Sequence, residues 1–235
     1  MKKAFFTVTL SLVVATSFSQ QLSVTAGGTY SKWRDDFTSY RLGFDVGAIC
    51  VFQSDSVPFC FNAALMLVDK GVCLDGKKSI EGGGEYRFRT SLYSVHVPAT
   101  VGYKVSCCKG RMTVIPTVGI YADYGFFGKI SQTAEISHLG GFEHYVAKYD
   151  GKDPYSEMEK LEYQGVKNFK RFDWGLHAGL QLHLTKQVYL YGGYDYGMNK
   201  VWENMYFNPY FSSFYLNLGY LFVPSKKKMP VLEEI

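Results

Sequence analysis

The stretch RFDWGLHAGLQLHL, from Arg171 to Leu184, decides the fold. Every second residue is apolar, which gives the row Phe172, Trp174, Leu176, Ala178, Leu180, Leu182 and Leu184. The residues between them form a second row, Arg171, Asp173, Gly175, His177, Gly179, Gln181 and His183. Such strict alternation is typical of a β-strand with two unlike faces. The apolar face must lie against a protein core or against lipid, and the two possibilities imply different proteins.

The same alternation recurs in seven further segments of the chain. They cover residues 22–31, 40–52, 59–67, 93–105, 114–124, 187–200 and 213–222. Segments of roughly 10 to 14 residues match the length that a tilted strand needs to cross a bilayer. No apolar run after residue 20 is long enough for a transmembrane helix, so a membrane-spanning chain must form a closed barrel. We therefore predict an all-β fold, an eight-stranded antiparallel up-and-down transmembrane β-barrel.

The spacers between these segments differ in length in a regular way. Three are tight and read QSDSVP, SCCKG and TK, whereas the long ones contain DKGVCLDGKKSIEGGGE, residues 129–170 and VWENMYFNP. Tight and long spacers fall on alternate connections, so the two rims of an up-and-down barrel differ. Outer-membrane barrels have short periplasmic turns and long outer loops. With an even number of strands, both chain ends then lie at the periplasmic rim.

The polar rows show whether the apolar rows face lipid or a protein core. They are rich in glycine, with isolated Arg, Asp, His and Tyr, whereas a face exposed to bulk water favours Lys, Glu, Thr and Ser. Eight strands enclose an interior only wide enough for side chains, where glycines relieve crowding and charged residues pair. We predict a lumen polar network of Arg41, Asp45, His96, Asp123, Asp173, His177 and Asp195. The apolar rows accordingly face lipid.

The two ends of the chain indicate export and a short tail. MKKAFFTVTLSLVVATSFSQQ has two lysines, a short apolar run and then small residues, which is typical of a secretory signal peptide cleaved after Ser19. We predict a signal peptide over residues 1–19, a barrel over residues 20–222 and a periplasmic tail over residues 223–235. The tail follows the terminal aromatic Phe222 and is either frayed or makes a periplasmic contact of its own.

Composition narrows the choice of partners. Loss of Lys2 and Lys3 with the signal peptide lowers the formal net charge from +4 to +2, which leaves no basic face for nucleic acid. Aromatic residues make up 17% of the chain, and such rings collect where an apolar wall meets water. We therefore predict outer-membrane lipid as the surroundings, the cell outer membrane as the location, and no nucleic-acid partner.

Cysteines and glycine runs give no sign of a cofactor. Five cysteines occur in an exported chain, where disulfides form. Cys60 begins one predicted strand and Cys108 follows the end of its neighbour, so we predict a disulfide between them, with Cys107 as the alternative. An odd count leaves one thiol unpaired in a monomer. No metal-ligand spacing is present, and EGGGE lacks the strand and helix that flank a phosphate loop, so we predict no cofactor and no metal site.

The longest spacer carries the remaining functional signals. Ser137 and His138 lie side by side there, but adjacent residues of a strand point in opposite directions, and nothing else marks an oxyanion hole. We therefore predict that the protein is not an enzyme. A spacer as long as residues 129–170 is usually functional or disordered, and its exposed Tyr and Phe favour a protein partner at the outer loops.

Several segments together resemble a known family. They are LSVTAGGTYSKW, YSVHVPATVGYKV, RFDWGLHAGLQLHL, VYLYGGYDYGMNK and FYLNLGYLF. The chain resembles the small outer-membrane β-barrel proteins of Gram-negative bacteria, and within them the porin-family, PorT-like kind. The matching positions are Tyr93, Val95, Val97 and Pro98 in one strand and residues 194–197 in another. The resemblance covers nearly all of the mature chain, and it implies an architecture rather than an activity.

Four functions fit a protein of this kind. The leading hypothesis is a non-enzymatic barrel with a structural, adhesion or assembly role through its outer loops. A narrow, porin-like pore for small solutes is the alternative, although eight strands argue against an open channel. A lipid-modifying hydrolase and a secreted lipocalin-like binder are less favoured, and the second of these requires apolar rows that point inward.

Overall fold

The computed structural model describes residues 19–34, 38–53, 57–76, 84–107, 112–136, 145–156, 168–201 and 209–222 of the 235-residue chain. The predicted signal peptide before Ser19 and the predicted tail after Phe222 lie outside these residues. Within the described ranges, no helix combines the length and the apolar character needed to span a bilayer.

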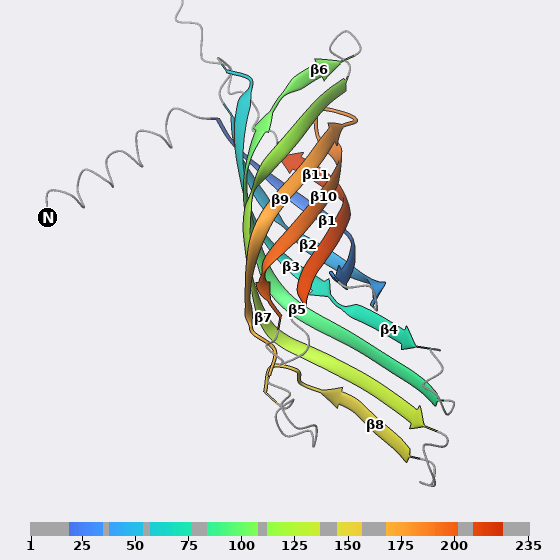
Figure 1. Ribbon diagram of the computed structural model, residues 1–235. Coiled ribbons are helices and arrows are strands. Elements are labelled where there is room, and N and C mark those ends of the chain that lie inside the picture. Colours follow the sequence, from blue (N-terminus) through green and yellow to red (C-terminus); the bar gives the residue numbers. More distant parts are fainter. Residues whose placement is uncertain are drawn as a thin grey trace, which may run out of the picture.

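Eight long strands form the wall of a closed barrel (Figure 1). They are β1 (Ser19–Trp33), β2 (Ser39–Gln53), β3 (Phe59–Lys70), β5 (Gly84–Tyr103), β7 (Met112–Ile136), β9 (Phe172–His183), β10 (Val188–Lys200) and β11 (Tyr210–Phe222). Each strand pairs in antiparallel fashion with the next one in this series, and β11 pairs back onto β1. The prediction of an eight-stranded antiparallel up-and-down barrel is confirmed.

Three short strands extend or flank this ring within the described ranges. β4 (Val72–Gly76) follows β3 after the single residue Gly71, and β6 (Val105–Cys107) follows β5 after Lys104. β8 (Tyr145–Lys152) lies outside the ring and pairs with β7. The eleven strand segments therefore still amount to eight passes through the barrel wall.

The apolar rows point outward, as the sequence predicts. Phe44, Leu180 and Leu218 are 51%, 51% and 56% exposed on the outer surface of the barrel. His177, in the polar row of the same strand as Leu180, is only 3% exposed. An arrangement like that of a lipocalin, with apolar rows inside, is therefore wrong for this chain.

Outward-facing aromatic rings gather near both ends of the barrel strands. Toward the long-loop end these exposed rings include Tyr30, Tyr124, Trp174 and Tyr196, and toward the short-turn end they include Phe59, Tyr103, Tyr220 and Phe222. Between the two groups the outer surface carries mainly Leu, Val, Ile and Ala. This arrangement fits a wall whose middle contacts hydrocarbon and whose edges lie at the two membrane–water interfaces.

The structure differs from the sequence prediction beyond the outer rim. Residues 72–76, 84–91, 129–136 and 145–152, which were predicted as loops, form strands that pair in the order β4, β5, β7 and β8. We call these four segments the outer sheet, and Figure 1 shows it running away from the barrel at the end opposite β6. Its strands alternate too, since Phe88 and Thr90 are buried while Arg87 and Arg89 are exposed. Arg87, Arg89 and the nearby EGGGE run resemble a loop in sequence, although the pairing of β5 with β7 begins at Gly84.

A hydrophobic cluster joins the outer sheet to the barrel. We call it the mouth cluster, and its buried members are Trp33, Val72, Phe88, Leu92, Ile130, Phe169, Val201 and Phe211. The rings of Trp33 and Phe88 have centroids 5.7 Å apart, so the end of β1 packs on the outer part of β5. The outer sheet therefore has its own apolar core at the mouth of the barrel.

Candidate functional site

A buried lysine lies at the centre of the lumen. Lys70, the last residue of β3, is 3% exposed, and its ammonium forms an ion pair with Asp123 of β7. The same ammonium lies 3.5 Å from Oδ2 of Asp195 on β10. Because β3 and β10 lie on opposite sides of the ring, this one side chain links opposite walls of the barrel.

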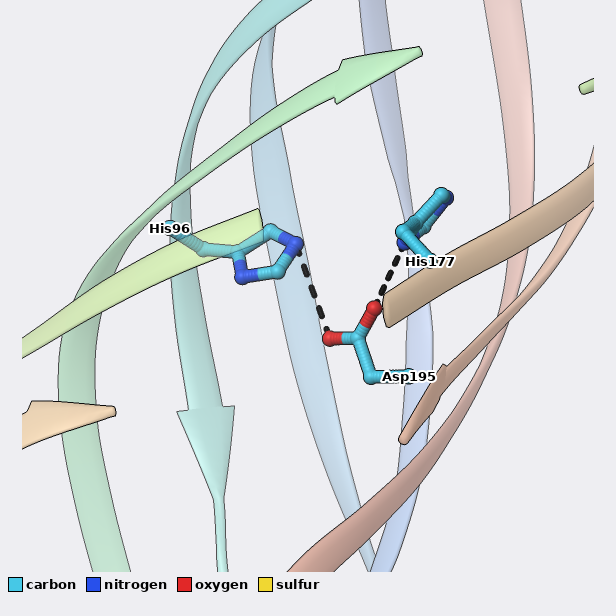
Figure 2. A group of neighbouring side chains, drawn as sticks. All are labelled: His96, His177 and Asp195. Atoms are coloured by element: carbon cyan, nitrogen blue, oxygen red, sulfur yellow. Dashed lines mark hydrogen bonds and ion pairs between the residues drawn. The ribbon is translucent and has the colours of Figure 1, made fainter. Parts of the chain in front are cut away.

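Two histidines flank this ion pair. Backbone register places His96 opposite Asp123 on the neighbouring strand, and it places His177 opposite Asp195 in the same way. Side chains opposite each other on one face of a sheet are about 5 Å apart at Cβ, so each imidazole meets a carboxylate. Nδ1 of His177 lies 2.5 Å from Oδ1 of Asp195, and Nε2 of His96 lies 3.6 Å from Oδ2. Figure 2 shows the carboxylate of Asp195 between the two rings.

Two tyrosine hydroxyl groups hold this arrangement in place. Tyr215 of β11 donates a hydrogen bond of 2.5 Å to Oδ2 of Asp195. Tyr191 of β10 is hydrogen-bonded to Nε2 of His177, so both nitrogens of that ring have partners. Hydrogen bonds of this kind fix the orientation of a buried carboxylate and imidazole.

The other predicted lumen residues form contacts of their own. Arg41 donates two hydrogen bonds, of 2.8 and 2.9 Å, to the carboxylate of Asp69. Asp45 accepts a hydrogen bond of 3.2 Å from Thr29 and a second one from Asn217. These pairs lie apart from the two histidines, so the predicted network divides into separate groups.

Asp173 lies beside the central group. Backbone register places it opposite Asp123, and its carboxylate accepts a hydrogen bond of 2.9 Å from Tyr121. The hydroxyl of Tyr121 thus satisfies the carboxylate of Asp173, while Lys70 pairs with that of Asp123.

We call the central group the lumen cluster, with the members Lys70, His96, Asp123, His177, Tyr191, Asp195 and Tyr215. Four of them belong to the network predicted from the sequence. The sequence interpretation missed Lys70 and the two tyrosines. The signal for Lys70 is its place in the inward row of β3, which reads Cys60, Asn62, Ala64, Met66, Val68 and Lys70. Tyr191 gave no such signal, because aromatic residues occupy both rows of β10, whereas Tyr215 lies in the inward row of β11 between Ser213 and Asn217.

The lumen cluster leaves little free space inside the barrel. A small cavity lies next to it, toward the periplasmic rim, where polar residues of the lining include Asn62, Thr100 and Gln181. His96, His177, Tyr191 and Tyr215 line its other side.

A second pocket opens at the outer mouth. Its lining includes Lys170, Arg171, Asp173 and Lys200. Arg171 donates hydrogen bonds of 3.1 Å to the carbonyl groups of residues 125 and 126, and its guanidinium lies 4.8 Å from the centre of the Tyr155 ring. Burial raises the pKa of the Tyr155 hydroxyl, because ionisation is unfavourable away from water. Through its contacts with residues 125 and 126 and with the Tyr155 ring, Arg171 holds the segment after β8 against the barrel.

A family model described as an outer membrane protein beta-barrel domain matches residues 6–203. The chain belongs to this family of outer-membrane β-barrels. The family and the closed ring of strands both indicate the outer membrane. The protein therefore resides there, with lipid around the barrel, as predicted. A comparison with curated proteins gave no match.

Solved structures of other outer-membrane barrels are similar to this family member. Neisserial surface protein A is 16% identical, with 86% of this chain and 95% of that chain covered and a TM-score of 0.37. The attachment invasion locus protein Ail of Yersinia pestis is 12% identical, with 88% and 99% covered and a TM-score of 0.38. OprG from Pseudomonas aeruginosa is 11% identical, with 87% and 97% covered and a TM-score of 0.42. These likenesses concern the fold alone.

Other sequence predictions for this outer-membrane barrel fall partly outside the described residues. Cys60 is buried in the lumen and Cys108 lies outside the described residues, so their disulfide stays a prediction. Ser137 and His138 also lie outside them. Gly84 and Glu85, the last two residues of the EGGGE run, belong to β5.

Proposed function

We propose that this protein is a non-enzymatic, closed outer-membrane barrel that presents the outer sheet to a partner outside the membrane. The role is one of structure, adhesion or assembly. The observation that carries the proposal is the combination of a lumen filled by the lumen cluster with a packed sheet beyond the outer rim.

The contents of the lumen support a barrel that does not conduct. Lys70 spans from β3 to Asp123 and Asp195, and all three side chains are almost fully buried. Eight-stranded barrels enclose only enough space for side chains, and here charged pairs occupy it. An ion that crosses would have to separate buried ion pairs, which costs several kcal/mol.

The outer sheet supports a contact role. β5 and β7 stay paired from Gly84 and Ile136 down to Gly102 and Thr117, so one ladder connects the outer sheet to the barrel wall. β8 pairs with β7, and no pairing on its other edge is found among the described residues. An unpaired edge is a template for a strand of another protein. We therefore propose that the partner binds the outer sheet through its strands β7 and β8 and the chain that follows them, within residues 129–170.

The finer family assignment is also a proposal. The Tyr93, Val95, Val97 and Pro98 positions that resemble the PorT-like kind lie in β5, the strand that continues into the outer sheet. This placement supports a shared architecture around that strand.

Two measurements on the mature chain test the proposed function. In planar bilayers we expect conductance at the level of the empty membrane, and conductance well above it would favour the narrow pore instead. In cells, we expect a photoreactive amino acid at Ala147 of β8 to crosslink to one defined partner, whereas the same group at lipid-facing Leu216 should not. Absence of a protein crosslink at Ala147 and at the opposite edge, Leu74 of β4, would remove the contact role.

A further inference from the structure

We propose that His96, His177 and Asp195 form a binding site for a divalent transition-metal ion inside the lumen, with Zn²⁺ as the representative ion. The three residues come from β5, β9 and β10, and they are 1%, 3% and 1% exposed. One possible ligand atom from each lies within 4.8 Å of the others. Figure 2 shows the two imidazoles approaching the carboxylate from different sides.

The distances are close to those that one ion requires. Bonds of about 2.0 to 2.2 Å to nitrogen and oxygen, arranged as a tetrahedron, place two ligand atoms of the same ion about 3.3 to 3.6 Å apart. Nε2 of His96 is 3.6 Å from Oδ2 of Asp195, which fits without change. The hydrogen bond of 2.5 Å between His177 and Asp195 must open, and ligand atoms as far apart as 4.8 Å must close by up to about 1.5 Å. Rotations of the three side chains about their χ angles would have to supply both changes.

His96 is a buried side chain without a hydrogen-bond partner. Among the described residues, neither Nδ1 nor Nε2 of its ring makes a hydrogen bond, although two carboxylates lie within 4 Å. Buried polar atoms are nearly always satisfied, so such an exception requires an explanation. A metal ion bound by Nε2 supplies the missing partner.

The buried charges favour an added cation. Asp45, Asp123 and Asp195 are 2%, 5% and 1% exposed inside the lumen. Among the described residues, Lys70 is the one lysine or arginine whose charge is buried with these carboxylates. Arg41 is paired with the carboxylate of Asp69 instead. A divalent ion held by two neutral imidazoles would balance the remaining negative charge.

Neighbouring side chains are placed as outer partners of metal ligands usually are. The hydrogen bond to Tyr191 on Nε2 of His177 leaves Nδ1 as the ligand and fixes the ring. Tyr215 donates to Oδ2 of Asp195, which directs Oδ1 toward His177. The small cavity beside both histidines has room for a water molecule as a further ligand. Lys70 makes its shorter contact with Asp123, and its ammonium also lies 3.5 Å from Oδ2 of Asp195.

Metal titration of the untagged mature chain, folded in detergent micelles and freed of metal by a chelator, tests the site. We expect one Zn²⁺ to bind per chain, and Co²⁺ to give a visible absorption band of an ion with nitrogen ligands. His96→Gln and His177→Gln should each weaken binding by at least about tenfold. His183→Gln is the matched control, because it alters a partly buried histidine of β9 outside the lumen cluster, and it should bind as the unaltered chain does.

X-ray absorption of the Zn²⁺-loaded, unaltered chain keeps the test decisive even where a variant does not fold. We expect the scattering pattern of two imidazole ligands together with oxygen. A chain that binds neither Zn²⁺ nor Co²⁺ would overturn the proposal. Binding of equal strength in both histidine variants, or a pattern with fewer than two imidazoles, would overturn it as well.

Discussion

Lys70 and Asp123 form an ion pair inside the lumen, although 53 positions separate them in the chain. Their side chains are 3% and 5% exposed, so water screens the interaction little. The pair joins β3 to β7, which are separated in the ring by β5. It therefore fixes how the strands curve around the lumen, and a charge left there without its partner should destabilise the barrel.

Replacing Lys70 tests this relationship. Lys70→Met leaves the carboxylates of Asp123 and Asp195 without their ammonium partner. We expect the free energy of unfolding to fall by about 3 to 5 kcal/mol, as it does when one partner of a buried ion pair is removed. Urea titration of the chain folded in lipid vesicles, followed by tryptophan fluorescence, measures the change. Lys186→Met, in the exposed turn after β9, should change it by less than about 0.5 kcal/mol, and an equally small effect at Lys70 would contradict the prediction.

A second prediction concerns crowding in the lumen at Gly219. A Cβ atom at this position would lie 2.0 Å from Cζ of Tyr189, whose hydroxyl is held by a hydrogen bond of 2.6 Å with Ser23. Gly219→Ala should therefore lower the free energy of unfolding by about 1 to 3 kcal/mol in the same titration. Gly192→Ala is the control, because a Cβ there meets nothing within 4 Å. Similar losses in both variants would show that crowding is not the cause.

A third prediction concerns the lipid-facing surface. Leu218 is 56% exposed and lies midway between the aromatic residues Phe214 and Phe222 on β11. Leu218→Arg should lower the free energy of unfolding in lipid vesicles by about 2 to 4 kcal/mol, because it places a charge near the middle of the bilayer. Gln187→Arg adds the same charge in the exposed periplasmic turn and should have almost no effect. If the two variants were equally stable, the apolar row would not face hydrocarbon.

The barrel could be predicted from the sequence because its signal is local. Alternation with a period of two appears within each strand and requires no knowledge of the neighbours. In the stretch from Arg171 to Leu184, this signal alone separates the exposed Leu180 from the buried His177. The same alternation places Lys70 in the inward row of β3, but the predicted segment ends at residue 67, before the lysine.

The contacts inside the lumen could not be predicted in the same way. They depend on the register between strands that are distant in the chain, and single-strand patterns do not contain it. Arg41 illustrates this, because Asp45 shares its face but lies four residues further along the strand, about 13 Å away. Its actual partner is Asp69, which register brings within 2.8 Å. The metal ligands likewise come from three strands, so their spacing in the sequence carries no metal-binding signal.

The last prediction concerns the mouth cluster, and it tests whether the outer sheet opens independently of the barrel. Phe88→Ala removes a buried ring that packs on Trp33, and such truncations cost about 3 to 5 kcal/mol. Because β9 and β10 make no part of the outer sheet, we expect faster amide hydrogen exchange in residues 84–91 but not in those strands. Lys129→Ala, an exposed change beside Ile130, should leave both rates unaltered. Faster exchange throughout the ring would mean that the outer sheet and the barrel open as one unit.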